Sequence, residues 1–155
     1  MKLGVGCFDF LVLPEGECWD RRGTLQVVKG VKSEYYHHPE ATRINECVVW
    51  VVREALEASS PRFNFYYVTE FTGDELRELA DRLGPARTLI ERCVSADELA
   101  TLVSTYVRGE VEDSWGPWKE QWARFRDLTV HSLEQLLEIV ARARSEQRAL
   151  LAIGI

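Results

Sequence analysis

The sequence lacks the short motifs that mark the common catalytic sites. It contains no GxSxG nucleophile elbow, no HExxH motif, no P-loop and no GxGxxG loop. Its 155 residues hold only three histidines and four cysteines, and no two cysteines have the CxxC spacing that is typical of structural zinc. We therefore expect no metal and no cofactor, and the sequence favours a binding protein over an enzyme.

Long apolar runs and an excess of basic charge are also missing. No segment approaches the ~20 apolar residues of a membrane span, and Met1-Lys2 leads directly into a strand-like pattern instead of a signal peptide. The net charge of −6 argues against nucleic acids and anionic membranes as partners. These features indicate a cytoplasmic protein with reduced thiols. The excess of arginine over lysine and the single methionine are typical of a GC-rich bacterial gene.

The composition and the hydrophobic pattern predict one globular domain. Hydrophobic residues make up 46% and charged residues 28% of the chain, which is close to the globular average. We expect a single α/β or α+β domain over residues 1–155, in which about five helices pack on a mixed sheet of about five strands. The expected strands cover residues 2–14, 24–31, 62–71, 86–94 and the C-terminal run ALLAIGI. That run is wholly apolar, so we place it inside the sheet with both faces covered. Residues 62–71 alternate most clearly and are expected to form a central strand.

Three of the five helices are predicted from the spacing of their apolar residues. One follows Pro39 and ends before Pro61, although the β-rich run CVVWVV leaves a strand as the alternative. An aromatic helix covers about Ser114 to Asp127. A last helix, SLEQLLEIVARARSEQ, begins at Ser132 with a capping box of its own.

The other two helices are predicted from N-terminal capping boxes. The helix that begins after Thr72 should stop at Gly84-Pro85. The boxes are Thr72 with Glu75 and Ser95 with Glu98, and the accompanying hydrophobic staples are Phe71 with Leu76 and Val94 with Leu99. Any two well-capped helices resemble each other. If the similarity between these two capped segments is more than that, it indicates two successive strand–helix units and a partly parallel sheet.

Four aromatic residues share one face of the aromatic helix. Trp115, Trp118, Trp122 and Phe125 are spaced three, four and three residues apart. At roughly 150–250 Å² each they would cover about 600–1,000 Å², whereas the largest exposed patch on a monomer is usually about 300–600 Å². This stripe must therefore be buried, and we expect most of it in the core. Trp115 lies at its edge and is the ring most able to reach a partner.

Two further segments offer contact surfaces. Glu110, Glu112 and Asp113 precede the stripe, and carboxylates beside tryptophans suit a basic protein partner. Residues 35–38 offer aromatic and polar groups just before an expected helix N-terminus, which favours anions. A contact surface and a packed connection remain equal alternatives for this loop. The candidate partner-binding residues are Tyr35, Tyr36, His37, His38, Glu112, Asp113 and Trp115.

The first strand carries two residues with chemical potential. Cys7 could pair with His37 in space, but we favour a small apolar residue packed within the strand. Asp9 stands between Phe8 and Phe10, and an acid there lies either in solvent or in a pocket. We favour the exposed placement.

Small size, acidity and aromatic contact surfaces favour a protein-binding domain that engages a basic partner. One concrete form is a bacterial immunity-type inhibitor, which neutralises a toxin by covering its active site. One alternative is a small enzyme or ligand-binding domain with a pocket near Asp9 and the Tyr35–His38 loop. Another is a homodimer joined through the aromatic helix.

Overall fold

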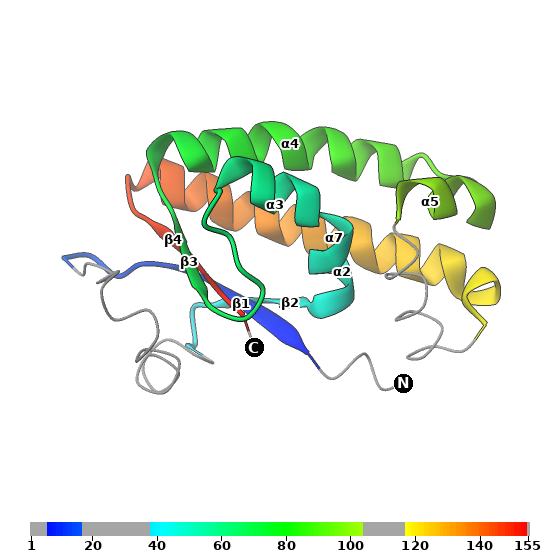
Figure 1. Cartoon of the computed structure of the whole chain (residues 1–155), viewed down its shortest axis with the longest axis horizontal. Coiled ribbons are helices and arrows are strands. Elements are labelled where there is room, and N and C mark those ends of the chain that lie inside the picture. Colours follow the sequence, from blue (N-terminus) through cyan, green and yellow to red (C-terminus); the bar gives the residue numbers. More distant parts are fainter. Residues whose placement is uncertain (1–5, 17–37, 104–116, 155) are drawn as a thin grey trace.

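The computed structural model describes residues 6–16, 38–103 and 117–154. In these residues five helices lie on one side of a four-stranded sheet (Figure 1), which confirms the α+β class. The strands are β1 (Cys7–Val12), β2 (Thr42–Asn45), β3 (Val68–Phe71) and β4 (Leu150–Ile153). The helices are α2 (Glu46–Val51), α3 (Arg53–Ser59), α4 (Gly73–Glu91), α5 (Ala96–Leu102) and α7 (Trp118–Ser145). No helix in these ranges is long and apolar enough to cross a membrane.

The sheet has the order β2-β1-β4-β3, and each neighbouring pair of described strands is antiparallel. This differs from the expected mixed sheet of about five strands. The C-terminal strand is confirmed, because all four residues of β4 are buried and β4 lies between β1 and β3. The expected strand over residues 24–31 lies outside the described residues.

The two faces of the sheet differ in what they contact. Phe8, Phe10 and Val12 of β1 belong to the main core, which also contains the buried residues of the helices. The alternate residues of β1 point to the second face. There, Leu13, Leu151 and Ile153 form a smaller apolar cluster.

The predicted central strand over residues 62–71 is largely wrong. Only Val68–Phe71 is a strand, and β3 lies at the edge of the sheet. In the preceding loop, Asn64 Oδ1 accepts a hydrogen bond from the Tyr66 N–H (2.9 Å), and the Asn64 N–H donates to Thr69 Oγ1 (3.2 Å). Asparagine favours turns of this kind, so it interrupts an otherwise alternating pattern.

The helix expected after Pro39 begins later than predicted. Residues 39–40 form a turn, β2 follows, and Asn45 then caps α2 by accepting a hydrogen bond from the Cys47 N–H (2.9 Å). The run CVVWVV is helical up to Val51, so the strand alternative is wrong, and a break at Val52 separates α2 from α3. We missed β2 because it is short and three of its four residues are polar.

Helix α4 continues through Gly84-Pro85, where it was expected to stop. The capping box is confirmed, since Glu75 Oε2 accepts a hydrogen bond from the Thr72 N–H (3.1 Å). Residues 86–91, predicted as part of a strand, are instead the last turns of this helix, so the partly parallel sheet is also wrong. A single buried stripe runs through both halves of the helix and outweighs the cost of the proline. It consists of Leu76, Leu79, Leu83 and Ile90.

The second capping box is confirmed at α5, but its hydrophobic staple is not. Ser95 Oγ accepts a hydrogen bond from the Glu98 N–H (3.2 Å), and Glu98 Oε2 accepts one from the Val94 N–H (2.9 Å). Leu99 is buried, whereas Val94 is 74% exposed and cannot pack against it as a staple.

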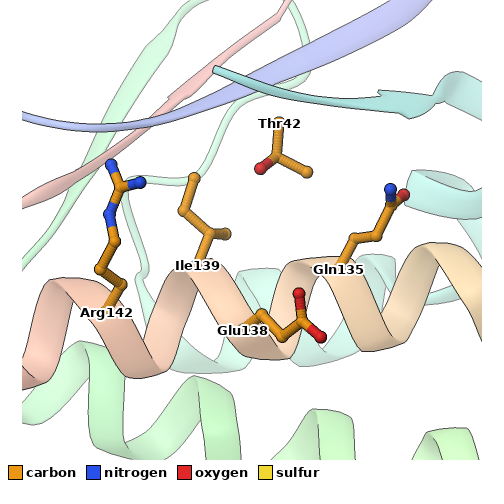
Figure 2. Close-up of a pocket in the computed structure, with 5 residues that line it drawn as sticks. All are labelled: Thr42, Gln135, Glu138, Ile139 and Arg142. Carbon is orange, nitrogen blue, oxygen red and sulfur yellow. The ribbon is translucent and has the colours of Figure 1, made fainter. Parts of the chain in front are cut away.

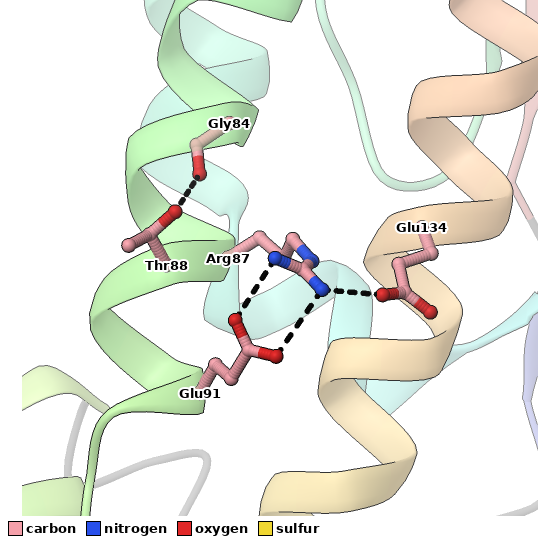
Figure 3. A network of polar contacts seen from close by, with 5 residues as sticks. All are labelled: Gly84, Arg87, Thr88, Glu91 and Glu134. Atoms are coloured by element: carbon pink, nitrogen blue, oxygen red, sulfur yellow. Dashed lines mark hydrogen bonds and ion pairs between the residues drawn. The ribbon is translucent and has the colours of Figure 1, made fainter.

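Helix α7 joins the two helices that were predicted separately. It runs unbroken from Trp118 to Ser145, antiparallel to α4 and beside it (Figure 1). Ser132 is a buried interior residue and not an N-cap. Thr129 is also buried, and its hydroxyl donates to the Phe125 carbonyl (2.8 Å), so the helix continues without an unsatisfied polar group at that position. Arg87 of α4 connects the two helices through an ion pair with Glu134 (Figure 3).

Candidate functional site

Most of the predicted partner-binding residues lie outside the described part of the chain. These are Tyr35, Tyr36, His37, Glu112, Asp113 and Trp115. His38 is half-buried, and its Nδ1 accepts a hydrogen bond from the Glu40 N–H (3.2 Å). The turn after it leads into β2, so the expected helix N-terminus beside this loop is wrong.

The described part of the aromatic stripe is core, as predicted. Trp118 is 3% exposed and Phe125 is 1% exposed, and their rings meet edge to face at 6.2 Å. Trp122 is half-buried, and the guanidinium carbon of Arg126 lies 5.2 Å from its ring centroid. These contacts remove most of the apolar area that motivated a homodimer through this helix.

Asp9 is buried, so the favoured exposed placement is wrong. Its relative exposure is 1%, and its Oδ1 lies 3.1 Å from Nε of Arg43. Arg43 is the direct cross-strand neighbour of Asp9 in β2, a strand that we did not predict. An ion pair with a half-exposed arginine lets a strand bury an acid that would otherwise need solvent.

The thiols of Cys7 and Cys93 are poor nucleophiles. Burial raises the pKa of Cys7, and the opposing effect of Arg43 is smaller. Burial likewise raises the pKa of Cys93. The reactive form of cysteine is the thiolate, which a raised pKa disfavours. Over residues 6–16, 38–103 and 117–154, no group of three or more His, Cys, Asp or Glu side chains is arranged to hold a metal ion.

We expect Cys7 and Cys93 to react slowly with iodoacetamide at pH 7.5, and faster only as the pH rises above 9.0, the ordinary pKa of a cysteine thiol. The folded state disfavours both thiolates, so the same groups should destabilise the fold once the unfolded thiols ionise, near pH 9 and above. Labelling resolved by peptide mass spectrometry over pH 7–10 measures both rates. Rapid labelling of Cys7 at pH 7 would show that it is activated.

The most exposed aromatic feature of the described residues is the loop 61–67, which we did not predict as a contact surface. Tyr66 is 68% exposed and Tyr67 is 37% exposed. The neighbouring Phe65 is buried and stacks on Trp50 with ring centroids 4.1 Å apart. Arg53 lies over both of those rings, at 5.0 Å and 5.6 Å. The loop therefore combines an anchored ring with two outward tyrosines.

Gly154, the residue that follows β4, contacts the backbone of this loop. The Gly154 N–H donates to the Tyr67 carbonyl (3.3 Å). A β-carbon at Gly154 would lie 1.9 Å from the carbonyl oxygen of Phe65, a distance that no packed atom tolerates. Position 154 therefore requires glycine so that the loop can approach the strand.

Gly154→Ala should displace the loop and lower the free energy of unfolding by about 1–3 kcal/mol, the usual cost of overpacking. Thermal unfolding measures the loss, and near-ultraviolet circular dichroism reports the Trp50–Phe65 stack. Gly84→Ala is the control, because no atom lies within 4 Å of its added β-carbon. An unchanged near-ultraviolet spectrum in Gly154→Ala would show that the close approach of Gly154 does not fix the position of the loop 61–67.

Two open cavities lie along α7. One, of about 250 Å³, is lined by Thr42, Gln135, Glu138, Ile139 and Arg142 (Figure 2). The other, of about 340 Å³, is lined by Glu91, Arg126, Asp127, Val130, His131 and Glu134. In the second cavity, Glu91 and Glu134 both pair with Arg87, as Figure 3 shows, and Arg126 pairs with Asp127.

Comparison with known proteins gives no further guide to the site. No family model, no curated protein and no solved structure matches the chain.

Proposed function

We propose that the protein binds another protein and that the loop 61–67 forms part of the contact surface. The observation that carries this proposal is the fixed presentation of Tyr66 and Tyr67. Tyrosine supplies a large contact area with little side-chain entropy to lose, and it is enriched among the residues that dominate binding energy. Because Phe65 and Gly154 already hold the loop, binding would cost little further ordering.

The proposed partner is a basic protein. The net charge of −6 would steer a positively charged partner toward this domain and speed association. The concrete form that we propose is a bacterial, cytoplasmic immunity-type inhibitor that covers the active site of a toxin.

The test compares three forms of the full chain as tagged baits in extracts of the source cell. The wild type and Val94→Ser should capture the same basic protein, because Val94 is an exposed apolar residue remote in sequence from the loop. The double variant Tyr66→Ser/Tyr67→Ser should bind it at least about tenfold more weakly, as expected for loss of interface anchors. Binding should also weaken as the salt concentration rises.

Two outcomes would count against the proposal. A partner that binds the tyrosine variant as tightly as the wild type would place the surface elsewhere. If no protein is captured, the small enzyme or ligand-binding domain with a pocket near Asp9 becomes the better hypothesis.

A further inference from the structure

The cavity between β2 and the C-terminal half of α7 is lined mainly by polar and charged side chains. Figure 2 shows the side chains of Gln135, Ile139 and Arg142 extending from α7 toward β2, where Thr42 lies. Ile139 is 4% exposed and supplies an apolar floor. The other lining residues are polar or charged, so an apolar surface is flanked by hydrogen-bonding groups.

These polar groups have little to bind within the described residues. The side chains of Thr42, Gln135 and Glu138 make no hydrogen bond or ion pair there. The nearest carboxylate oxygens to Arg142 are those of Glu146 at 3.8 Å and Glu40 at 3.9 Å. Both distances exceed the 2.7–3.2 Å of a hydrogen bond, so the guanidinium donors of Arg142 remain available. By contrast, most charged groups on α4 are held in ion pairs of 2.7–2.9 Å.

The two charged side chains that line this cavity have opposite charges. Glu138 and Arg142 are four residues apart, so they lie on adjacent turns of one helix face, with β-carbons about 5–6 Å apart. No ion pair joins them within the described residues. A ligand that carries both an ammonium and a carboxylate could contact both side chains at once.

The volume limits the size of such a ligand. A closed cavity of about 150 Å³ accommodates benzene, and sites for drug-sized ligands occupy about 300–1,000 Å³. A cavity of about 250 Å³ lies between the two and suits a molecule of amino-acid size.

We infer that this cavity binds a small zwitterion, an α-amino acid with an apolar side chain. Its carboxylate accepts hydrogen bonds from Arg142, its ammonium donates to Glu138, and its side chain contacts Ile139. Gln135 and Thr42 supply further hydrogen bonds to the charged end. This site is separate from the loop 61–67 and does not depend on protein binding.

The experiment titrates the full chain with L-leucine and follows backbone amide resonances by NMR. Resonances of Thr42, Glu138, Ile139 and Arg142 should shift with saturation, at a Kd on the order of 1 mM for a small open site. Two matched probes each lack one charge: 4-methylpentanoate has no ammonium, and 3-methylbutylamine has no carboxylate. Each should bind at least about tenfold more weakly than leucine, because a charge-assisted contact is lost.

Matched variants separate the site from general charge effects. Arg142→Gln and Glu138→Gln should each weaken leucine binding about tenfold or more. The controls Arg144→Gln and Glu120→Gln should leave binding unchanged, since neither residue lines the cavity; Arg144 shares the last turn of α7 with Arg142. Thermal unfolding of each variant confirms that it is folded. Absence of saturable shifts up to about ten times the expected Kd, equal binding of 4-methylpentanoate, or an equal loss in the controls would each overturn the inference.

Discussion

Replacing Phe125 with alanine should lower the free energy of unfolding by about 3–5 kcal/mol, the usual cost of truncating a buried aromatic ring. Phe125 is 1% exposed and lies edge to face with Trp118, so the surrounding side chains cannot close the space without moving this second ring. At about 2–4 °C per kcal/mol for a chain of this length, the melting temperature should fall by roughly 10 °C. Urea unfolding monitored by circular dichroism measures the free energy directly.

Trp122→Ala is the internal comparison on the same helix face. Trp122 is half-buried, and the partly buried side chain of Arg126 lies over its ring. We expect a loss of only about 1–2 kcal/mol, since less apolar area leaves water in the wild type. Equal losses for the two variants would mean that the outer part of the stripe is as fully packed as the inner part.

The second large expected effect is an increase in stability. Pro85→Ala should raise the free energy of unfolding by about 2–3 kcal/mol, because proline in a helix interior costs about 3 kcal/mol relative to alanine. Proline also restricts the unfolded chain, which offsets part of that cost. Pro85 lies on the exposed side of α4, and alanine restores an N–H that can donate to the Asp81 carbonyl. The melting temperature should rise by roughly 5–10 °C.

The neighbouring glycine tests whether the gain comes from the helix backbone. Gly84→Ala should add about 1 kcal/mol through helix propensity alone, because its new β-carbon meets no other atom within 4 Å. A lower melting temperature in Pro85→Ala would show that the pyrrolidine ring makes stabilising contacts that outweigh the helix-propensity cost of proline in α4.

The elements that sequence reasoning located well are those whose local pattern and final packing agree. The run ALLAIGI is apolar at every position, and it forms the strand that is covered on both faces. The boxes at Thr72 and Ser95 are local hydrogen-bond arrangements, and both form at the predicted residues. The core positions of Trp118 and Phe125 follow directly from helical spacing.

The errors arise where a local signal was outweighed by contacts distant in sequence. Gly84-Pro85 is a strong stop signal, but the leucine stripe of α4 continues past it against α7. Ser132 and Gln135 match a capping box, yet no glycine or proline precedes them, and Thr129 and Ser132 continue the buried face between the two apolar stretches. In both cases the periodicity over the whole helix was the better guide.

The candidate sites depended even more on tertiary structure. The burial of Asp9 depends on β2, which brings Arg43 beside it from a distant part of the chain. The cavity at Ile139 likewise combines β2 with α7. Tyr66 and Tyr67 were not predicted as a contact surface, because we placed them in a regular strand over residues 62–71. In the structure they lie at the end of the loop that precedes β3.

The place of β4 in the sheet has a consequence for how the protein folds during synthesis. β4 is the last described element in the chain, yet β1, the first, and β3 are joined in the sheet only through it. At about 5–20 residues per second, roughly 7–30 s separate the appearance of β1 from that of β4. During that interval the pairing edge of β1 has no β4 to pair with, and edges of that kind promote aggregation. A chain truncated before Leu150 would therefore leave β1 paired only with β2 and would leave β3 without a partner among the described strands.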